Sequence, residues 1–147
     1  MIKRRAVTAA LKTLLESTGR PVGLGRMPQA QPPYFILYDV DTSVSGAPFA
    51  DDNEDLSVVY QVTTVSGPDP ATQGSAGALD QAEFWADKAR EAVLSRDPAT
   101  GLWVTALTVA GARVMCRELE IEPGGTSDPA DGIISYVQRF RFDLTPA

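Results

Sequence analysis

Histidine is absent from the sequence, and Cys116 is its single cysteine. Histidine is the commonest general base and a frequent zinc ligand, so its absence argues against the usual serine and cysteine catalytic triads and against most zinc sites. A lone cysteine cannot close an internal disulfide, which excludes a disulfide framework and favours folding in a reducing compartment. We therefore predict a protein that is not an enzyme and that needs no metal or cofactor.

Excess basic charge and long apolar runs are also lacking. The chain has 13 lysine and arginine residues against 19 aspartate and glutamate residues, a formal net charge of −6. Because a nucleic-acid binder must neutralise phosphates, this balance argues against tight binding to DNA or RNA. No apolar stretch approaches the roughly 20 residues of a membrane-spanning helix, so we expect no membrane partner. Lys3-Arg4-Arg5 resembles the start of a signal peptide, but the apolar run behind it ends at Lys12, which predicts a helix and no targeting segment.

What the sequence does contain is a series of periodic apolar patterns in a chain of 147 residues. Apolar residues at helical spacing predict one helix over residues 3–16 and another from residue 72 or 75 to residue 94. The apolar stripe of the second helix is mostly alanine, and small side chains let a helix lie close to a sheet. With no internal repeat and no linker between domains, we expect a single domain over residues 1–147.

Extended patterns separate and follow the two helical ones. Runs of alternating or continuous apolar residues predict strands over residues 34–40, 56–65, 113–121 and 133–144, a short strand over 22–24, and a weaker strand or connector over 103–109. Within residues 113–121, the alternation sets Met115, Leu119 and Ile121 on one face. The first long run is almost wholly apolar, as expected of a strand covered on both faces.

Segments rich in glycine, proline and aspartate predict the connections. Residues 41–55 and 122–132 are expected to form two long loops, and residues 97–101 a turn. The order of elements then predicts an α+β fold, in which an antiparallel sheet of about four to five strands carries two helices packed on one face. The last two strands are expected to be hairpin partners.

One acidic cluster has the spacing of metal ligands. Asp51, Asn53 and Asp55 match the first half of a calcium-binding loop, in which alternate residues supply oxygen ligands. The second half does not match, because Leu56 stands in place of the required glycine and Val62 in place of the bidentate glutamate. We predict a solvated acidic loop and leave weak divalent binding open.

Two aromatic residues are candidates for contacts with other subunits. By helical geometry Phe84 lies on the face opposite the Trp85 stripe, among acidic residues. Either the C-terminal part of the chain covers this ring, or the ring anchors a neighbouring subunit, since aromatic side chains are favoured at interface cores. Phe49, inside the predicted loop over residues 41–55, poses the same question.

The whole pattern resembles the tail terminator proteins of long-tailed bacteriophages. The resemblance is carried by the opening helix, residues 33–38, residues 55–65, residues 82–90 and the terminal hairpin, in that order over nearly the whole chain. It is a likeness of order and length rather than of a sharp motif. It implies a ring, expected to be hexameric, that sits in the virion at the head-proximal end of the tail and is assembled in the host cytoplasm.

The resemblance also implies partners and contact residues. One face of the ring would meet the tail tube protein and stop its polymerisation, the other would meet a head-completion or connector protein, and DNA would pass through the channel without specific binding. Phe84, Arg90 and Phe49 are candidates for contacts between subunits or with partners. Candidates for lumen or axial contacts are the acidic residues of the two predicted loops: Asp51, Asp52, Glu54, Asp55, Asp128 and Asp131.

Two other functions fit the same patterns. The chain has the features of another neck or tail component, such as a head-completion or tail tube protein. A small ligand-binding or hydrolytic domain that uses carboxylates and a divalent ion is the alternative from a different class, and it would require a concave pocket with converging acids.

Overall fold

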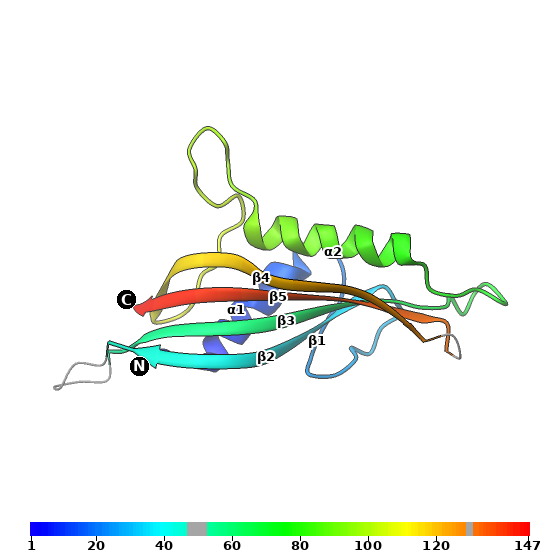
Figure 1. Cartoon of the computed structure of the whole chain (residues 1–147), viewed down its shortest axis with the longest axis horizontal. Coiled ribbons are helices and arrows are strands. Elements are labelled where there is room, and N and C mark those ends of the chain that lie inside the picture. Colours follow the sequence, from blue (N-terminus) through cyan, green and yellow to red (C-terminus); the bar gives the residue numbers. More distant parts are fainter. Residues whose placement is uncertain (47–52, 129–130) are drawn as a thin grey trace.

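The computed structural model describes residues 1–46, 53–128 and 131–147, except for the side chains of 127 and 128. These residues form two helices and one five-stranded sheet: α1 (Arg4–Glu16), β1 (Val22–Leu24), β2 (Tyr34–Ser45), β3 (Asp55–Ser66), α2 (Leu79–Leu94), β4 (Ala112–Asp128) and β5 (Ile133–Pro146). The strand order is β1-β2-β3-β5-β4 (Figure 1). The predicted α+β class is confirmed, as is the pairing of the last two strands. The short first pair, β1 with β2, is parallel.

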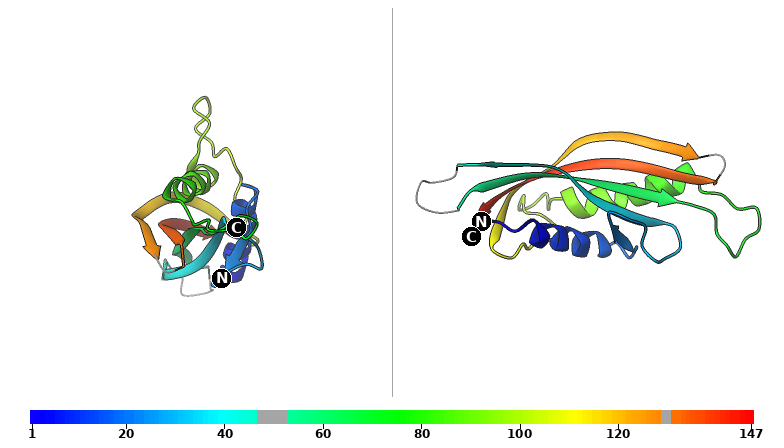
Figure 2. Two further views of the ribbon diagram at one scale, coloured as in Figure 1. Left: turned by 90° about the vertical axis from the view of Figure 1, so that its right-hand side faces the viewer. Right: turned by 90° about the horizontal axis from the view of Figure 1, so that it is seen from below.

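Both helices lie on the same side of the sheet (Figure 2). The buried residues of α1 recur at helical spacing: Val7, Leu11, Leu14 and Leu15. Those of α2 are mostly alanines: Ala82, Ala86, Ala89 and Val93. Burying a leucine or valine side chain is worth roughly 1.5–3 kcal/mol, so its stripe, rather than helix propensity, fixes the position of α1. The small alanine side chains of α2 let that helix lie close to the sheet.

The central strands supply the other half of this core. In β3 the residues Leu56, Val58, Tyr60 and Val62 face the helices. Their partners across the β3–β5 ladder include Phe142, opposite Val58, and Phe140, opposite Tyr60. The predicted alternation of both strands is therefore confirmed, because a strand buried on one face places every second side chain in the core.

The opposite side of the sheet is partly apolar and partly charged. Tyr34, Ile36 and Val65 form a second buried cluster, so the start of β2 is covered on both faces, as predicted. Farther along this side, Arg139 Nε donates a hydrogen bond to Gln61 Oε1 at 3.1 Å. Arg141 pairs with Glu118 at 2.8 Å.

The second predicted long loop is largely wrong, and the first is wrong over residues 41–45. Residues 41–45 continue β2, which stays paired with β3 as far as Ser45 and Asp55. Residues 122–128 continue β4, in which Gly124 and Gly125 pair with β5. These residues are mostly exposed or lack a side chain, so the strands that they form leave no alternating apolar pattern.

Two smaller predictions also need correction, and the structure decides a third that was left open. The second helix begins at Leu79 rather than at residue 72 or 75. Of the two alternatives for residues 103–109, the structure has the connector, because these residues form no named strand and take part only in isolated bridges at Trp103 and Val109. Register shifts in β4, one after Val114 and another after Leu119, break the predicted alternation, and Met115 and Ile121 are exposed.

The core contains one long-range polar contact that can be tested directly. Tyr60 is fully buried, and its hydroxyl makes a 2.6 Å hydrogen bond with Thr8 Oγ1 of α1. Tyr60→Phe is expected to lower the free energy of unfolding by about 1 kcal/mol at neutral pH, the usual net value of such a bond. Chemical denaturation of both proteins measures the difference.

The same pair predicts a pH dependence. Burial, with a smaller effect from Asp39, raises the pKa of Tyr60 above its ordinary value of 10.0. Above that pH the unfolded chain loses this proton before the folded chain does, so the folded state binds more protons and stability falls as pH rises. Phenylalanine has no proton to lose, so the stability of Tyr60→Phe does not fall in this way. The difference in free energy of unfolding between wild type and variant is therefore expected to narrow from pH 9 to pH 11. A constant gap would contradict the assignment.

Candidate functional site: exposed contact surfaces

The acidic candidates do not form one site. Phe49, Asp51 and Asp52 lie outside the described residues. Glu54 is half-buried and Asp55 begins β3. Asp128 ends β4, where its backbone pairs with Ile133, and Asp131 is exposed in the turn that follows. The Asp55 and Asp131 regions lie at opposite ends of the long axis of the molecule (Figure 1).

No metal centre is formed by the described part of the chain. Within it, no three histidine, cysteine, aspartate or glutamate side chains come together in a way that could hold an ion. The calcium-like spacing of Asp51, Asn53 and Asp55 extends outside the described residues, so that hypothesis stays a prediction. None of the described helices is long and apolar enough to cross a membrane.

Phe84 is exposed on α2, with 51% of its surface open to solvent. Its ring meets the edge of Trp85 with centroids 5.2 Å apart, and the Lys88 ammonium lies 5.5 Å from its centroid. The C-terminal part of the chain therefore does not cover Phe84, and its role as an anchor for a neighbour stays a prediction. Arg90, the other candidate on α2, lies 3.9 Å from a carboxylate oxygen of Glu122 on β4. That pair is long and partly exposed, so it contributes little to stability.

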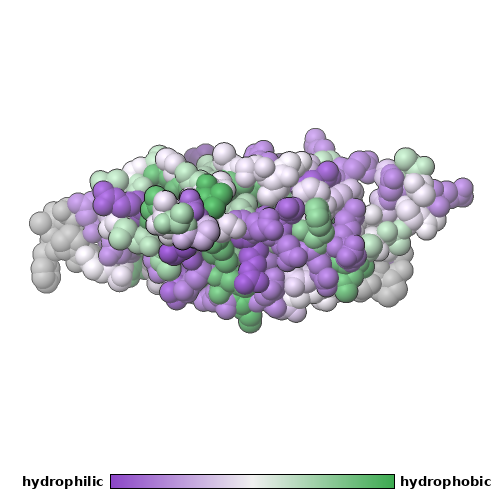
Figure 3. Space-filling model, turned by 90° about the horizontal axis from the view of Figure 1, so that it is seen from above, coloured by the Kyte–Doolittle hydropathy of each residue, from purple (hydrophilic) through white to green (hydrophobic). Residues whose placement is uncertain are grey.

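A projecting arm was not expected from the sequence. Residues 95–104, which we call the arm, leave the end of α2 and extend away from the body of the molecule (Figure 1). Two large aliphatic side chains on it are exposed, Leu102 at 69% and Val104 at 64%. Apolar residues gather among polar ones on the side from which the arm projects (Figure 3). The signal in the sequence was the apolar run directly after the predicted turn over residues 97–101.

The base of the arm is held by a buried cation. Arg117 of β4 is 6% exposed, and its Nη1 donates to the carbonyls of Val93, at 3.2 Å, and Thr105, at 2.9 Å. Its guanidinium carbon lies 4.7 Å from the centroid of the Trp103 ring, and that of Arg96 lies 4.0 Å from the same centroid. Burial, and secondarily Arg96, lowers the pKa of Arg117. Such cation–π contacts are worth about 0.5–2 kcal/mol each and fix the orientation of the indole.

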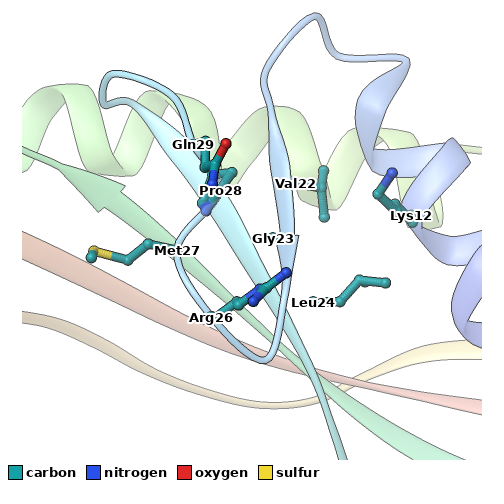
Figure 4. A pocket seen from close by; sticks show the side chains of 8 residues that line it. All are labelled: Lys12, Val22, Gly23, Leu24, Arg26, Met27, Pro28 and Gln29. Carbon is teal, nitrogen blue, oxygen red and sulfur yellow. The ribbon is translucent and has the colours of Figure 1, made fainter.

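A groove lies at the β1 edge of the sheet, and we call it the β1 groove (Figure 4). It has a volume of about 580 Å³ and is lined by Lys12, Val22, Gly23, Leu24, Arg26, Met27, Pro28 and Gln29. A Cβ on Gly23 would lie 1.9 Å from the Arg26 carbonyl oxygen, so only glycine lets the chain turn back this closely. Met27 is 66% exposed beside the groove. The lining combines aliphatic side chains with two cations and holds no acid–base pair.

The exposed arm, Phe84 and the β1 groove are thus surfaces suited to contact with other molecules, on an α+β fold. The sequence matches no protein-family model and no curated protein. Among solved structures, the fold is similar to that of a chain in the virion of a native gene transfer agent particle, with a TM-score of 0.61 and 13% sequence identity. The likeness covers 97% of this chain and 96% of that one, so the two share a fold over almost their whole length.

Proposed function

We propose that this protein is a structural component of a phage-like virion, and that it is the terminator that caps the tail tube as a ring. The observation that carries the proposal is the full-length fold similarity to a chain of a gene transfer agent virion. The order of helices and strands that resembles tail terminators supports the finer assignment. In this role the protein ends tube growth and presents a joining surface to the head.

The surfaces fit a protein that acts through its contacts with other proteins. Each subunit of a closed ring needs two different patches, one for each neighbour. The exposed aliphatic residues of the arm and the exposed Phe84 of α2 supply apolar contacts. The proposed partners are further copies of this chain, the tail tube protein and a head-completion or connector protein. A net charge of −6 fits a channel through which DNA passes without binding.

Purified protein added to growing tail tubes tests this proposal. We expect gold-labelled protein at one end of each tube in electron micrographs, and tubes that become shorter as more protein is added. Native mass by light scattering is expected to show a ring, free or on the tube. A tail tube protein would instead label the whole length, and a head-completion protein would label heads; either pattern would replace the terminator assignment with another virion role.

A further inference from the structure

We propose that the arm of one subunit docks into the β1 groove of the next copy of this chain, an inference that rests on the proposed assembly function. In this contact Leu102 and Val104 enter the groove beside Met27, and Asp97 approaches Arg26. The step is a non-covalent association that buries exposed aliphatic surface on both sides.

The arm has a defined shape before it meets a partner. Val104 N donates to Ser95 O at 2.9 Å, Asp97 N donates to Leu102 O at 2.8 Å, and Gly101 N donates to Asp97 O at 2.7 Å. The Asp97 carboxylate also accepts a hydrogen bond from Ala99 N at 2.8 Å, which closes the turn. An arm held in this way loses little conformational entropy on binding. Trp103, the residue between Leu102 and Val104, contacts the guanidinium groups of Arg96 and Arg117, and the two aliphatic residues are left exposed.

The β1 groove is complementary to the arm in both polarity and charge. Its rim carries exposed aliphatic side chains, Leu24 and Met27, matching the two on the arm. Lys12 is paired with Glu16 at 3.1 Å. Across the part of the chain that the structure describes, neither Arg26 of the groove nor Asp97 of the arm is in an ion pair. Opposite charges at the rim of an apolar contact favour one register and speed association.

The two surfaces are placed for a head-to-tail contact. β1 and β4 are the two edges of the sheet. The groove is built on β1, whereas the arm is anchored to β4 through Arg117. A contact between different patches at opposite edges repeats from copy to copy and closes into a ring when the rotation permits. The occupant that fits the groove is therefore a second copy of this chain.

Mixed disulfide formation tests the contact itself. Leu102→Cys and Met27→Cys are made in separate Cys116→Ser chains, mixed and oxidised, and the products are resolved by mass spectrometry. We expect the mixed Leu102–Met27 product to exceed the share that random pairing of the two chains would give. The control is Val44→Cys in place of Leu102→Cys, at a residue 58% exposed near the end of β2, and it is expected to give no excess. A predominance of Leu102–Leu102 products, or equal yields with Val44→Cys, would overturn the inference.

A matched pair of serine variants tests the energetics. Val104→Ser is expected to weaken self-association about tenfold or more, the effect of losing one buried aliphatic side chain, whereas Val44→Ser leaves it unchanged. Asp97→Asn keeps the turn but removes the charge, and it is expected to slow association at low salt only. Caps or rings that form without the mixed disulfide would overturn the arm contact and leave the terminator function intact. The mixed disulfide in a protein that never caps tubes would support the contact and reject that function.

Discussion

Phe140→Ala is expected to lower the free energy of unfolding by about 3–5 kcal/mol, the usual range for deleting a buried phenylalanine. Phe140 is fully buried in β5, between Tyr60 of β3 and Leu119 of β4. Both neighbouring strands and the helices over them pack on this side of the sheet, so the surroundings cannot collapse into the space that the ring leaves. Typical domains are stable by only 5–15 kcal/mol, so the variant is expected to be close to unfolding at 37 °C.

Phe84→Ala is the matched control for this prediction. The same side chain is lost, but from the exposed face of α2, where its edge-to-face contact with Trp85 is worth about 0.5–1.5 kcal/mol. Urea denaturation followed by tryptophan fluorescence measures both variants. If the two variants lost the same free energy of unfolding, Phe140 would not be the centre of the core. Phe84→Ala also separates folding from assembly, because an anchor for a neighbour would lower self-association without lowering stability to the same extent.

The parts of the fold that the sequence predicts well are those with one buried face. Val7, Leu11 and Leu14 repeat at the helical period because α1 covers the sheet with one stripe. Phe140 and Phe142 alternate with Arg139 and Arg141 because β5 has a buried side and an open side. Burial of one face imposes a regular spacing of apolar residues, and that spacing can be recognised in the sequence.

The ends of β2 and β4 could not be predicted, because they have no buried face that would impose a period. Val44 is exposed although it pairs with Leu56, and Gly124 has no side chain that could show which face of the strand is buried. Their strand conformation comes from hydrogen bonds to partners that are themselves strands, which is information that lies elsewhere in the chain. The register shifts in β4 add residues that no fixed period accommodates.

The candidate contact surfaces were predicted only in part. Helical geometry predicted that Phe84 lies on the face opposite the buried stripe, but it left open whether another segment covers the ring, and the structure leaves the ring exposed. No comparable rule predicts the arm or the β1 groove. Both are built by turns whose direction depends on Gly23, Gly101 and the contacts of Arg117. The acidic candidates came from two separate predicted segments, and pairing of β2 with β3 and of β4 with β5 places the Asp55 and Asp131 regions at opposite ends of the molecule.

Arg117→Met is expected to lower the free energy of unfolding by about 2–3 kcal/mol and to release the arm. Methionine keeps most of the packing volume but leaves the carbonyls of Val93 and Thr105 without their donor, and each unpaired buried carbonyl costs about 1–3 kcal/mol. Part of this loss is offset, because the buried charge is itself unfavourable and Nε has no hydrogen-bond partner among the described residues. Trp103 also loses one of its two cation contacts.

Amide hydrogen exchange distinguishes release of the arm from general destabilisation. In Arg117→Met the Val104 amide, which donates to Ser95, is expected to exchange faster by more than the global loss of stability explains, whereas amides of the β3–β5 ladder change only by that loss. Arg113→Met, at an exposed arginine of the same strand, is the control and should leave both classes unchanged. Equal changes across the molecule would mean that Arg117 stabilises the fold as a whole and that the arm is positioned by other contacts.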